Sequence, residues 1–209
     1  MRRMPIIAGL LAVVASTVSC GDVVREGRSP VYLVIDSLEG AQGNHPGTFG
    51  SPLLSDVITN VTSPPPCTAA APCPTVFNDI GQVRLRSSLK NLGETPGQAF
   101  APTANNDVTI TRYHVEFVRA DGRNTPGIDV PYAFDGSATG TVQANGTLTM
   151  PFEIVRHTAK GETPLVQLIV SPTVISTIAN VTFYGRDAVG NEISVTGSLT
   201  VNFGNFGDQ

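Results

Sequence analysis

The feature that most restricts the fold of this chain is a series of segments in which apolar and polar residues alternate. The last segment is the clearest: from Ile193 to Phe203 the odd-numbered positions are apolar or glycine and the even-numbered positions are polar. Successive side chains of a β-strand point to opposite faces, so this pattern predicts a strand with one buried and one solvated face. The same alternation predicts strands over residues 82–90, 107–120 and 147–155.

Weaker patterns predict further strands and the turns between them. These strands cover residues 31–35, 53–59, 128–134, 138–143 and 174–185, with 21 Gly and 16 Pro in the chain to supply turns. Asp135-Gly136 and Asn145-Gly146 are turn signals, and the second predicts a hairpin that joins 138–143 to 147–155. One short helix is expected within residues 160–170, beginning near Pro164.

The absence of a series of helical patterns decides the fold class. A parallel sheet needs helices to cover it, whereas antiparallel sheets can cover one another. We therefore expect an all-β protein, an antiparallel β-sandwich of about 8–9 strands with at most one short helix.

Three details of the strands give sharper expectations. The apolar phase changes between Ile110 and Tyr113, which predicts a β-bulge near Thr111-Arg112. Pro151 cannot donate a ladder hydrogen bond and predicts an edge strand. Residues 31–35 are apolar throughout, as expected for a strand covered on both faces.

The amino terminus has the three regions of an export signal. Arg2 and Arg3 precede an apolar run from Ile6 to Val18, and small residues follow it up to Cys20. The run is shorter than the roughly 20 residues that a membrane-spanning helix needs. Removal of this signal would take away Arg2 and Arg3, and so make the formal net charge more negative than −4.

Val18-Ser19-Cys20 resembles the end of a bacterial lipoprotein signal. The resemblance implies cleavage before Cys20 and acylation of its thiol and new amino group, which anchor the protein to a membrane. Gly21, in place of an inner-membrane Asp, implies the outer membrane or cell surface. An ordinary secretory signal that leaves Cys20 a free thiol remains the alternative. The expected organisation is a signal peptide over residues 1–19, a tether over 20–30, a single sandwich domain over 31–206 and a tail over 207–209.

The other two cysteines are consistent with export. Cys67 and Cys73 lie close together in a proline-rich loop, where an oxidising compartment favours a disulfide. A metal site would need further soft ligands, and the distant histidines do not provide an obvious pair.

The segment from Phe183 to Glu192 (FYGRDAVGNE), followed by an alternating strand, resembles the final hairpin of bacterial immunoglobulin-like domains. The resemblance implies an immunoglobulin-like sandwich, although the chain has 0 Trp and so lacks the core tryptophan of antibody domains. Such domains serve as adhesins, spacers, binding modules and enzyme appendages, and the fold does not choose among them.

The sequence contains few signs of catalysis or cofactor binding. It has no Gly-x-Ser-x-Gly turn and no phosphate loop, and its histidines, His45, His114 and His157, are far apart. We therefore expect no catalytic residue, no cofactor and no enzyme activity. The best calcium candidate is the cluster Asp187, Asn191 and Glu192, whose alternative role is to bond the backbone of its own turn.

Two groups of residues are candidates for contact surfaces. Arg84, Arg86 and Lys90 form a basic cluster, for which the alternative is a solvated strand face, and Tyr132 is the best aromatic candidate. With 13 basic and 17 acidic residues the chain has no basic stripe for nucleic acid.

These observations predict a lipid-anchored envelope protein with a non-catalytic, structural or protein-binding sandwich, such as a subunit of a surface or export assembly. Its expected partners are the membrane, through acyl chains on Cys20, and envelope proteins. The alternative is a surface lipoprotein that binds a small ligand, a glycan or calcium.

Overall fold

The computed structural model describes residues 27–91 and 101–207. The signal peptide and Cys20 lie outside these residues. The strands are β1 (Val31–Ala41), β2 (Leu53–Asp56), β3 (Thr59–Val61), β4 (Cys73–Thr75), β5 (Asp79–Leu89), β6 (Val108–Val118), β7 (Phe134–Val142), β8 (Thr147–Val155), β9 (Ile175–Asp187) and β10 (Glu192–Gly204). The helical segments are η2 (Ala104–Asn106), α1 (His157–Lys160) and η3 (Leu165–Ile169). The all-β prediction is confirmed.

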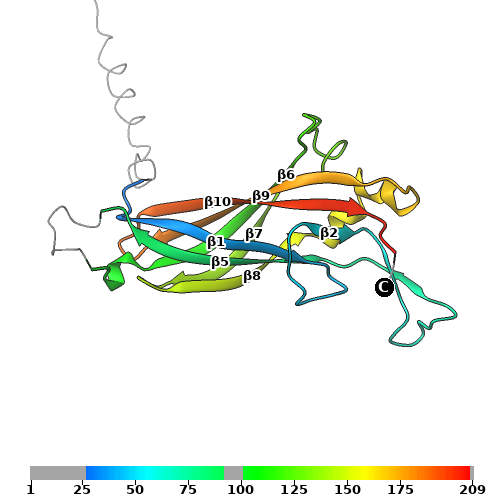
Figure 1. The fold of residues 1–209 in the computed structure, drawn as a ribbon, viewed down its shortest axis with the longest axis horizontal. Helices are drawn as coiled ribbons and strands as arrows, with labels where there is room; N and C mark the ends of the chain where they lie inside the picture. The colour runs from blue at the N-terminus through cyan, green and yellow to red at the C-terminus, as the bar shows by residue number, and fades with distance from the viewer. Residues whose placement is uncertain (1–26, 92–100, 208–209) are drawn as a thin grey trace, which may run out of the picture.

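Two β-sheets make up most of the molecule (Figure 1). One has three strands in the order β1-β5-β8, and the other has five in the order β2-β10-β9-β6-β7. Strands β3 and β4 form a separate two-stranded sheet. The pairings are antiparallel except that of β2 with β10, which is parallel.

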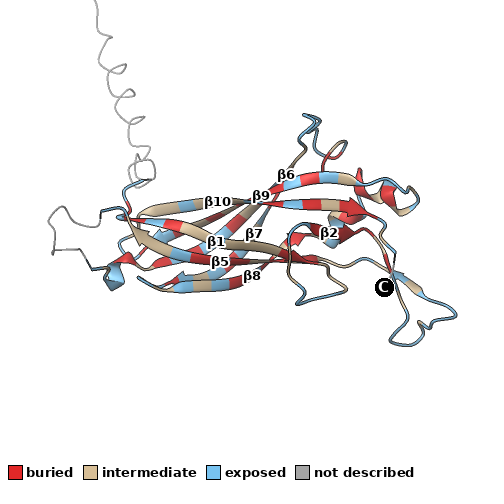
Figure 2. Ribbon diagram, in the orientation of Figure 1, coloured by how far each residue is buried: buried red, intermediate tan, exposed pale blue. Residues whose placement is uncertain are grey.

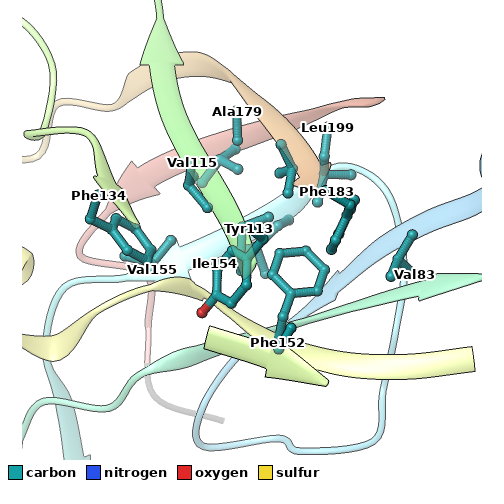
Figure 3. Close-up of a cluster of buried hydrophobic side chains, with 14 of the residues drawn as sticks. Val83, Tyr113, Val115, Phe134, Phe152, Ile154, Val155, Ala179, Phe183 and Leu199 are labelled. Atoms are coloured by element: carbon teal, nitrogen blue, oxygen red, sulfur yellow. The ribbon is translucent and has the colours of Figure 1, made fainter. Parts of the chain in front are cut away.

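The core lies between the two large sheets. Side chains from the inner faces are buried, and they alternate with exposed ones along each strand (Figure 2). The ring of Tyr113 on β6 lies 5.2 Å from that of Phe152 on β8 and 6.3 Å from that of Phe183 on β9 (Figure 3). The Tyr113 hydroxyl accepts a hydrogen bond from the Glu153 amide at 3.2 Å. This aromatic cluster joins one sheet to the other.

Several predicted details of the strands are confirmed. The register of β6 shifts between Ile110 and Arg112 against both of its neighbours, which is the position of the predicted bulge. Strand β8 is an edge of its sheet, as Pro151 predicted. The last strand buries Leu199, Val201 and Phe203, in agreement with its alternation.

The predicted hairpin around Asn145-Gly146 is wrong, although the turn itself is present. Asn145 has a φ of 63°, and the Gly146 amide donates to the Gln143 carbonyl at 2.8 Å. However, β7 pairs with β6 in the five-stranded sheet, whereas β8 pairs with β5 in the three-stranded sheet. The turn therefore crosses between sheets. Both flanking strands need a buried face, and alternation does not say whether that face belongs to the same sheet.

Other expectations also need correction. Residues 31–35 are not covered on both faces, because Tyr32 is exposed. The predicted strand over 53–59 ends at Asp56, and the next one, β3, begins at Thr59. Residues 128–133 form a loop, and Asp135-Gly136 lies inside β7, where Gly136 makes room for the Tyr113 ring. Gly136 is therefore required for packing against the Tyr113 ring and does not mark a turn.

The helical content is small. The segment predicted as a helix near Pro164 is the 3₁₀ turn η3, preceded by the four-residue helix α1 (Leu165–Ile169 and His157–Lys160). Among the described residues no helix has the length and apolar character needed to cross a membrane.

Candidate contact surfaces at the two ends of the sandwich

The strands run along the long axis of the molecule, so its loops gather at two ends (Figure 1). At one end, here called the entry end, the described chain begins at Gly27 beside the β9–β10 turn and Lys90. The opposite half of the molecule, here called the far end, carries the β8–β9 segment (residues 156–174) and the β6–β7 loop (residues 119–133), which projects from its side. Each end gathers side chains that have no role in the core.

Exposed apolar side chains project from both far-end loops. Ile128 is 70% exposed and Tyr132 54% exposed in the β6–β7 loop, and Val170 is 90% exposed and Val174 54% exposed in the β8–β9 segment. The two loops are joined, because the Thr163 hydroxyl donates to the Gly127 carbonyl at 2.7 Å. We call Ile128, Tyr132, Val170 and Val174 the far-end apolar group. Tyr132 was predicted from the sequence, whereas the other three were not.

Ion pairs hold the start of the β6–β7 loop. The Arg119 guanidinium donates to both carboxylate oxygens of Asp121, at 3.1 and 2.7 Å, and Arg123 donates to one of them at 3.1 Å. Hydrogen bonds from Arg119 and Arg123 hold the pKa of Asp121 well below its ordinary value. The Asn124 side chain accepts from the Arg119 amide at 2.6 Å. Ile128 and Tyr132 are therefore presented by a loop with many local contacts.

A buried ion pair fastens the β8–β9 segment to the sandwich. Lys160, the last residue of α1, donates to Asp79 at the start of β5 at 3.0 Å, and both side chains are 1% exposed. The Ser55 hydroxyl and the Gly43 amide donate to the same carboxylate at 2.6 and 3.0 Å. Burial raises the pKa of Asp79, and the Lys160 charge opposes part of that rise.

This network was missed at the level of the sequence. Lys160 and Asp79 are 81 positions apart, and neither stands in a recognisable motif. The one signal in the sequence was that lysine is rare in this chain, since only Lys90 and Lys160 are present. That signal does not identify a partner.

A polar groove lies at the entry end, between β1 and the β9–β10 hairpin. Lys90 donates to the Gly27 carbonyl at 3.0 Å and lies 5.1 Å from the centre of the Tyr32 ring. Arg112 stacks on the Tyr184 ring at 3.6 Å. The charged and aromatic side chains that line the groove are Tyr32, Lys90, Arg112, Tyr184, Arg186 and Glu192. Aromatic and Arg side chains are enriched at protein contact surfaces, and Arg and Lys donate strong hydrogen bonds to carboxylates.

The structure separates the predicted basic cluster. Arg84 and Arg86 are exposed on β5, and Arg86 pairs with Asp36 at 2.7 Å. Lys90 lies beyond the end of β5 and lines the groove. The solvated-face alternative therefore describes Arg84 and Arg86, and Lys90 joins a different set of residues.

The predicted calcium cluster is used by its own turn. One Asp187 oxygen accepts from the amides of Val189 and Asn191 at 3.1 and 2.8 Å, and the other from the Asn191 side chain at 2.9 Å. Burial raises the pKa of Asp187, but hydrogen bonds from Asn191, Ser29 and Val189 outweigh it and lower the pKa overall. Glu192 pairs with Arg186 at 2.7 Å. No group of three or more His, Cys, Asp or Glu side chains in the described part of the chain is arranged to hold a metal.

The disulfide prediction is confirmed. Cys67 and Cys73 are bonded, with 5.3 Å between their Cα atoms. Cys73 is the first residue of β4, so the bridge closes the loop between β3 and β4. The bridge braces a small projecting hairpin and lies outside the main core.

Comparisons with known proteins identify no family. No protein-family model and no curated protein matches the chain. One similar solved structure is the X-ray structure of Northeast Structural Genomics Consortium target SoR45, at 10% identity and a TM-score of 0.35 over 82% of this chain and 86% of that chain.

Proposed function

We propose that this chain is an exported cell-envelope lipoprotein, anchored through acyl chains on Cys20 at the outer membrane or cell surface, whose sandwich binds another protein. Its role is structural, as a subunit of a surface or export assembly, and it has no catalysis of its own. The proposal is supported by the amino-terminal sequence, the oxidised cysteine pair and the distribution of exposed apolar side chains.

One observation carries the proposal: Gly27, where the described chain begins, lies at the entry end, whereas the two loops that carry the far-end apolar group lie in the opposite half of the molecule (Figure 1). A membrane attached through the segment before Gly27 would face the entry end. The far end would then point away from that membrane, where another envelope protein can reach it.

The far-end apolar group has the character of a contact site. Burial of apolar surface is favourable by roughly 25 cal/mol per Å². Ile128 and Val170 are 70% and 90% exposed, so their burial against a partner would stabilise a complex. Tyr132 adds an aromatic ring with a polar tip, a residue type enriched at interfaces. Isolated exposed apolar residues are ordinary, but two linked loops that present four of them favour binding.

The test begins with the full-length protein in its own membranes. Gentle detergent extraction followed by native mass measurement should give a reproducible complex larger than the 21.9 kDa chain. The Cys20→Ser variant should be lost from the membrane fraction and from the complex. A lone monomer in the wild-type extract would overturn the proposal.

Matched variants locate the contact. Ile128→Asp and Val170→Asp should release the co-purifying protein, because each places a charge within the far-end apolar group. Val189→Asp is the control, since Val189 is 62% exposed but lies in the β9–β10 turn at the entry end. If all three variants kept the complex, the far end would not be the contact site.

A further inference from the structure

We propose a second protein-binding surface, at the free edge of β10. Residues Glu192 to Thr196 accept an extended segment of a different protein as an added β-strand, and the entry-end groove takes an acidic side chain of that segment. The inference rests on the proposed function only in that the sandwich binds proteins.

The edge is open along the first part of β10. On one side β10 pairs with β9 from Glu192 to Phe203. On the other side its pairing partner among the described residues is β2, which covers Val201 to Gly204. Backbone groups of β10 upstream of Val201 therefore face outward without a strand partner in the part of the chain that the structure describes. Because β2 already binds in parallel to this edge, the edge accepts strands.

The entry-end groove sets the extent of the proposed surface. Glu192, Ile193 and Ser194 line the groove, so there is space beside this part of β10. Further along, side chains of Ile35 and Leu38 on β1 lie close to Gly197. An added strand is therefore expected beside Glu192 to Thr196, between the start of β10 and the point where β1 approaches it.

Both edge strands of the three-stranded sheet, β1 and β8, carry features that discourage strand addition, and the open part of β10 does not. In β1 the register shifts between Ile35 and Ser37, and β8 has Pro151 near its middle. Bulges and prolines both interrupt pairing with an incoming strand. The β9–β10 register is continuous, and β10 contains no proline and no charged residue after Glu192. A regular and uncharged edge is a template for β-augmentation.

An added strand would also cover apolar surface. Ile193 and Val195 on β10 are only half-buried at the margin of the core. Alternate side chains of an added strand would meet this margin, so apolar residues at every second position should be preferred.

The charges of the groove select the partner. Arg112 pairs with Asp135 at 3.2 Å and Arg186 with Glu192 at 2.7 Å. Lys90 contacts a carbonyl and an aromatic ring, and no carboxylate of the described residues pairs with it. An acidic side chain of the added strand, placed beside Glu192, would supply the carboxylate partner that Lys90 lacks among the described residues. The chain itself carries a net charge of −4, so a second copy is a less suitable partner than a different protein.

The test uses the purified full-length protein and short synthetic peptides with alternating Val and Thr. One pair of peptides carries Glu at the amino or the carboxyl end, to cover both strand directions. A matched pair carries Lys in its place, and a third pair has Pro at the centre. Hydrogen exchange of residues 192–196 and fluorescence anisotropy report pairing and affinity.

We expect a Glu peptide to slow exchange of the outward-facing amides in residues 192–196 by about tenfold or more at saturation. The Lys and Pro peptides should bind at least about tenfold more weakly. Lys90→Glu should reverse the preference between Glu and Lys peptides, whereas Arg84→Glu, on the outer face of β5, should not. Both variants keep the core intact, since both side chains are exposed.

Three results would overturn the inference. Unchanged exchange with every peptide would show that the edge does not accept strands. Protection in the isolated protein would show that the chain itself covers the edge, and protection that grows with protein concentration would show a second copy. The Ile128→Asp variant should bind peptides normally. Failure of strand addition at β10 can therefore be distinguished from failure of the far-end contact.

Discussion

At the scale of single residues, Asp79 and Lys160 show how an ion pair is held inside an apolar sandwich. The Asp79 carboxylate accepts hydrogen bonds from Lys160, Ser55 and Gly43, which belong to three different parts of the chain. An ion pair of this kind adds little net stability over a well-packed apolar pair, but removal of one member leaves the other charge buried and unpaired. The pair therefore matters most for where the β8–β9 segment sits.

Replacement of Asp79 by Ala should lower the free energy of unfolding by about 3–5 kcal/mol, because Lys160 would keep a buried charge without its partner. The control is Asp135→Ala, which removes the exposed partner of Arg112 and should cost about 1 kcal/mol or less. Urea titration followed by circular dichroism measures both. Equal costs would show that the burial of the pair has no energetic consequence.

The Asp187 turn should make stability depend on pH. The pKa of Asp187 is lowered in the folded protein from its ordinary value of 3.8, so the unfolded chain binds the proton more readily. The stabilisation is complete above about pH 4 to 5 and is lost as the pH falls through 3.8 toward the folded pKa. Asp187→Asn should lose less stability than the wild type between pH 5 and pH 3 in urea titrations at each pH. Parallel curves would contradict the assignment.

At the scale of elements, the sequence predicted strands better than it predicted their neighbours. The bounds expected for β8 match those observed, and the bulge in β6 lies where the apolar phase changes. Alternation reports which face of a strand is buried, and that information is local. The partner across the Asn145 turn is set by packing of the whole sandwich, which is why the expected hairpin became a crossing between sheets.

Two glycines in the strands are needed because aromatic rings lie directly on them. The Phe152 ring lies over Gly81 of β5, and the Tyr113 ring lies over Gly136 of β7. Gly81→Ala should destabilise the protein by about 1–3 kcal/mol, because the added methyl would displace a buried ring. Gly50→Ala is the matched control, since no atom beyond its two chain neighbours lies within 4 Å of the position that the added methyl would take. Thermal unfolding compares the two, and equal melting temperatures would contradict the close packing.

The disulfide stabilises its own hairpin more than the whole fold. Reduction, or the Cys67→Ser/Cys73→Ser double variant, should speed hydrogen exchange in residues 59–75. The global loss should not exceed about 2 kcal/mol, because the closed loop is short and β3 and β4 pair only with each other in the described structure. A loss as large as that of Asp79→Ala would mean that the hairpin supports the main sheets.

At the scale of the whole molecule, segments that are far apart in the sequence are neighbours in the sandwich. Strand β2 pairs with β10, from Leu53 opposite Val201 to Asp56 opposite Gly204. Such contacts were beyond the sequence patterns, which ended at strand positions and burial. For the same reason the sequence offered Tyr132 and Lys90 as single candidates. It did not show that the loop of Tyr132 is bonded to a second loop with exposed apolar residues, or that Lys90 contacts Tyr32 beside a groove.

One cooperative unfolding transition should follow from this arrangement. The aromatic cluster of Tyr113, Phe152 and Phe183 draws on both sheets, so neither sheet keeps its core when the other is lost. Near-ultraviolet and far-ultraviolet circular dichroism should therefore give the same urea midpoint. Separate midpoints would mean that one sheet survives alone.

The direction of the strands has a mechanical consequence for a tethered protein. Strand β1 begins at Val31, directly after the segment proposed as a tether, and runs toward the far end, and it pairs with β5 from Val31 opposite Leu89 to Ala41 opposite Ile80. Tension between an anchor on Cys20 and a partner at the far end would pull along β1, parallel to its length. The ladder would then be loaded in shear, so its hydrogen bonds would share the force and would not open one after another. A protein built this way can hold a load for a time set by its unfolding rate under force.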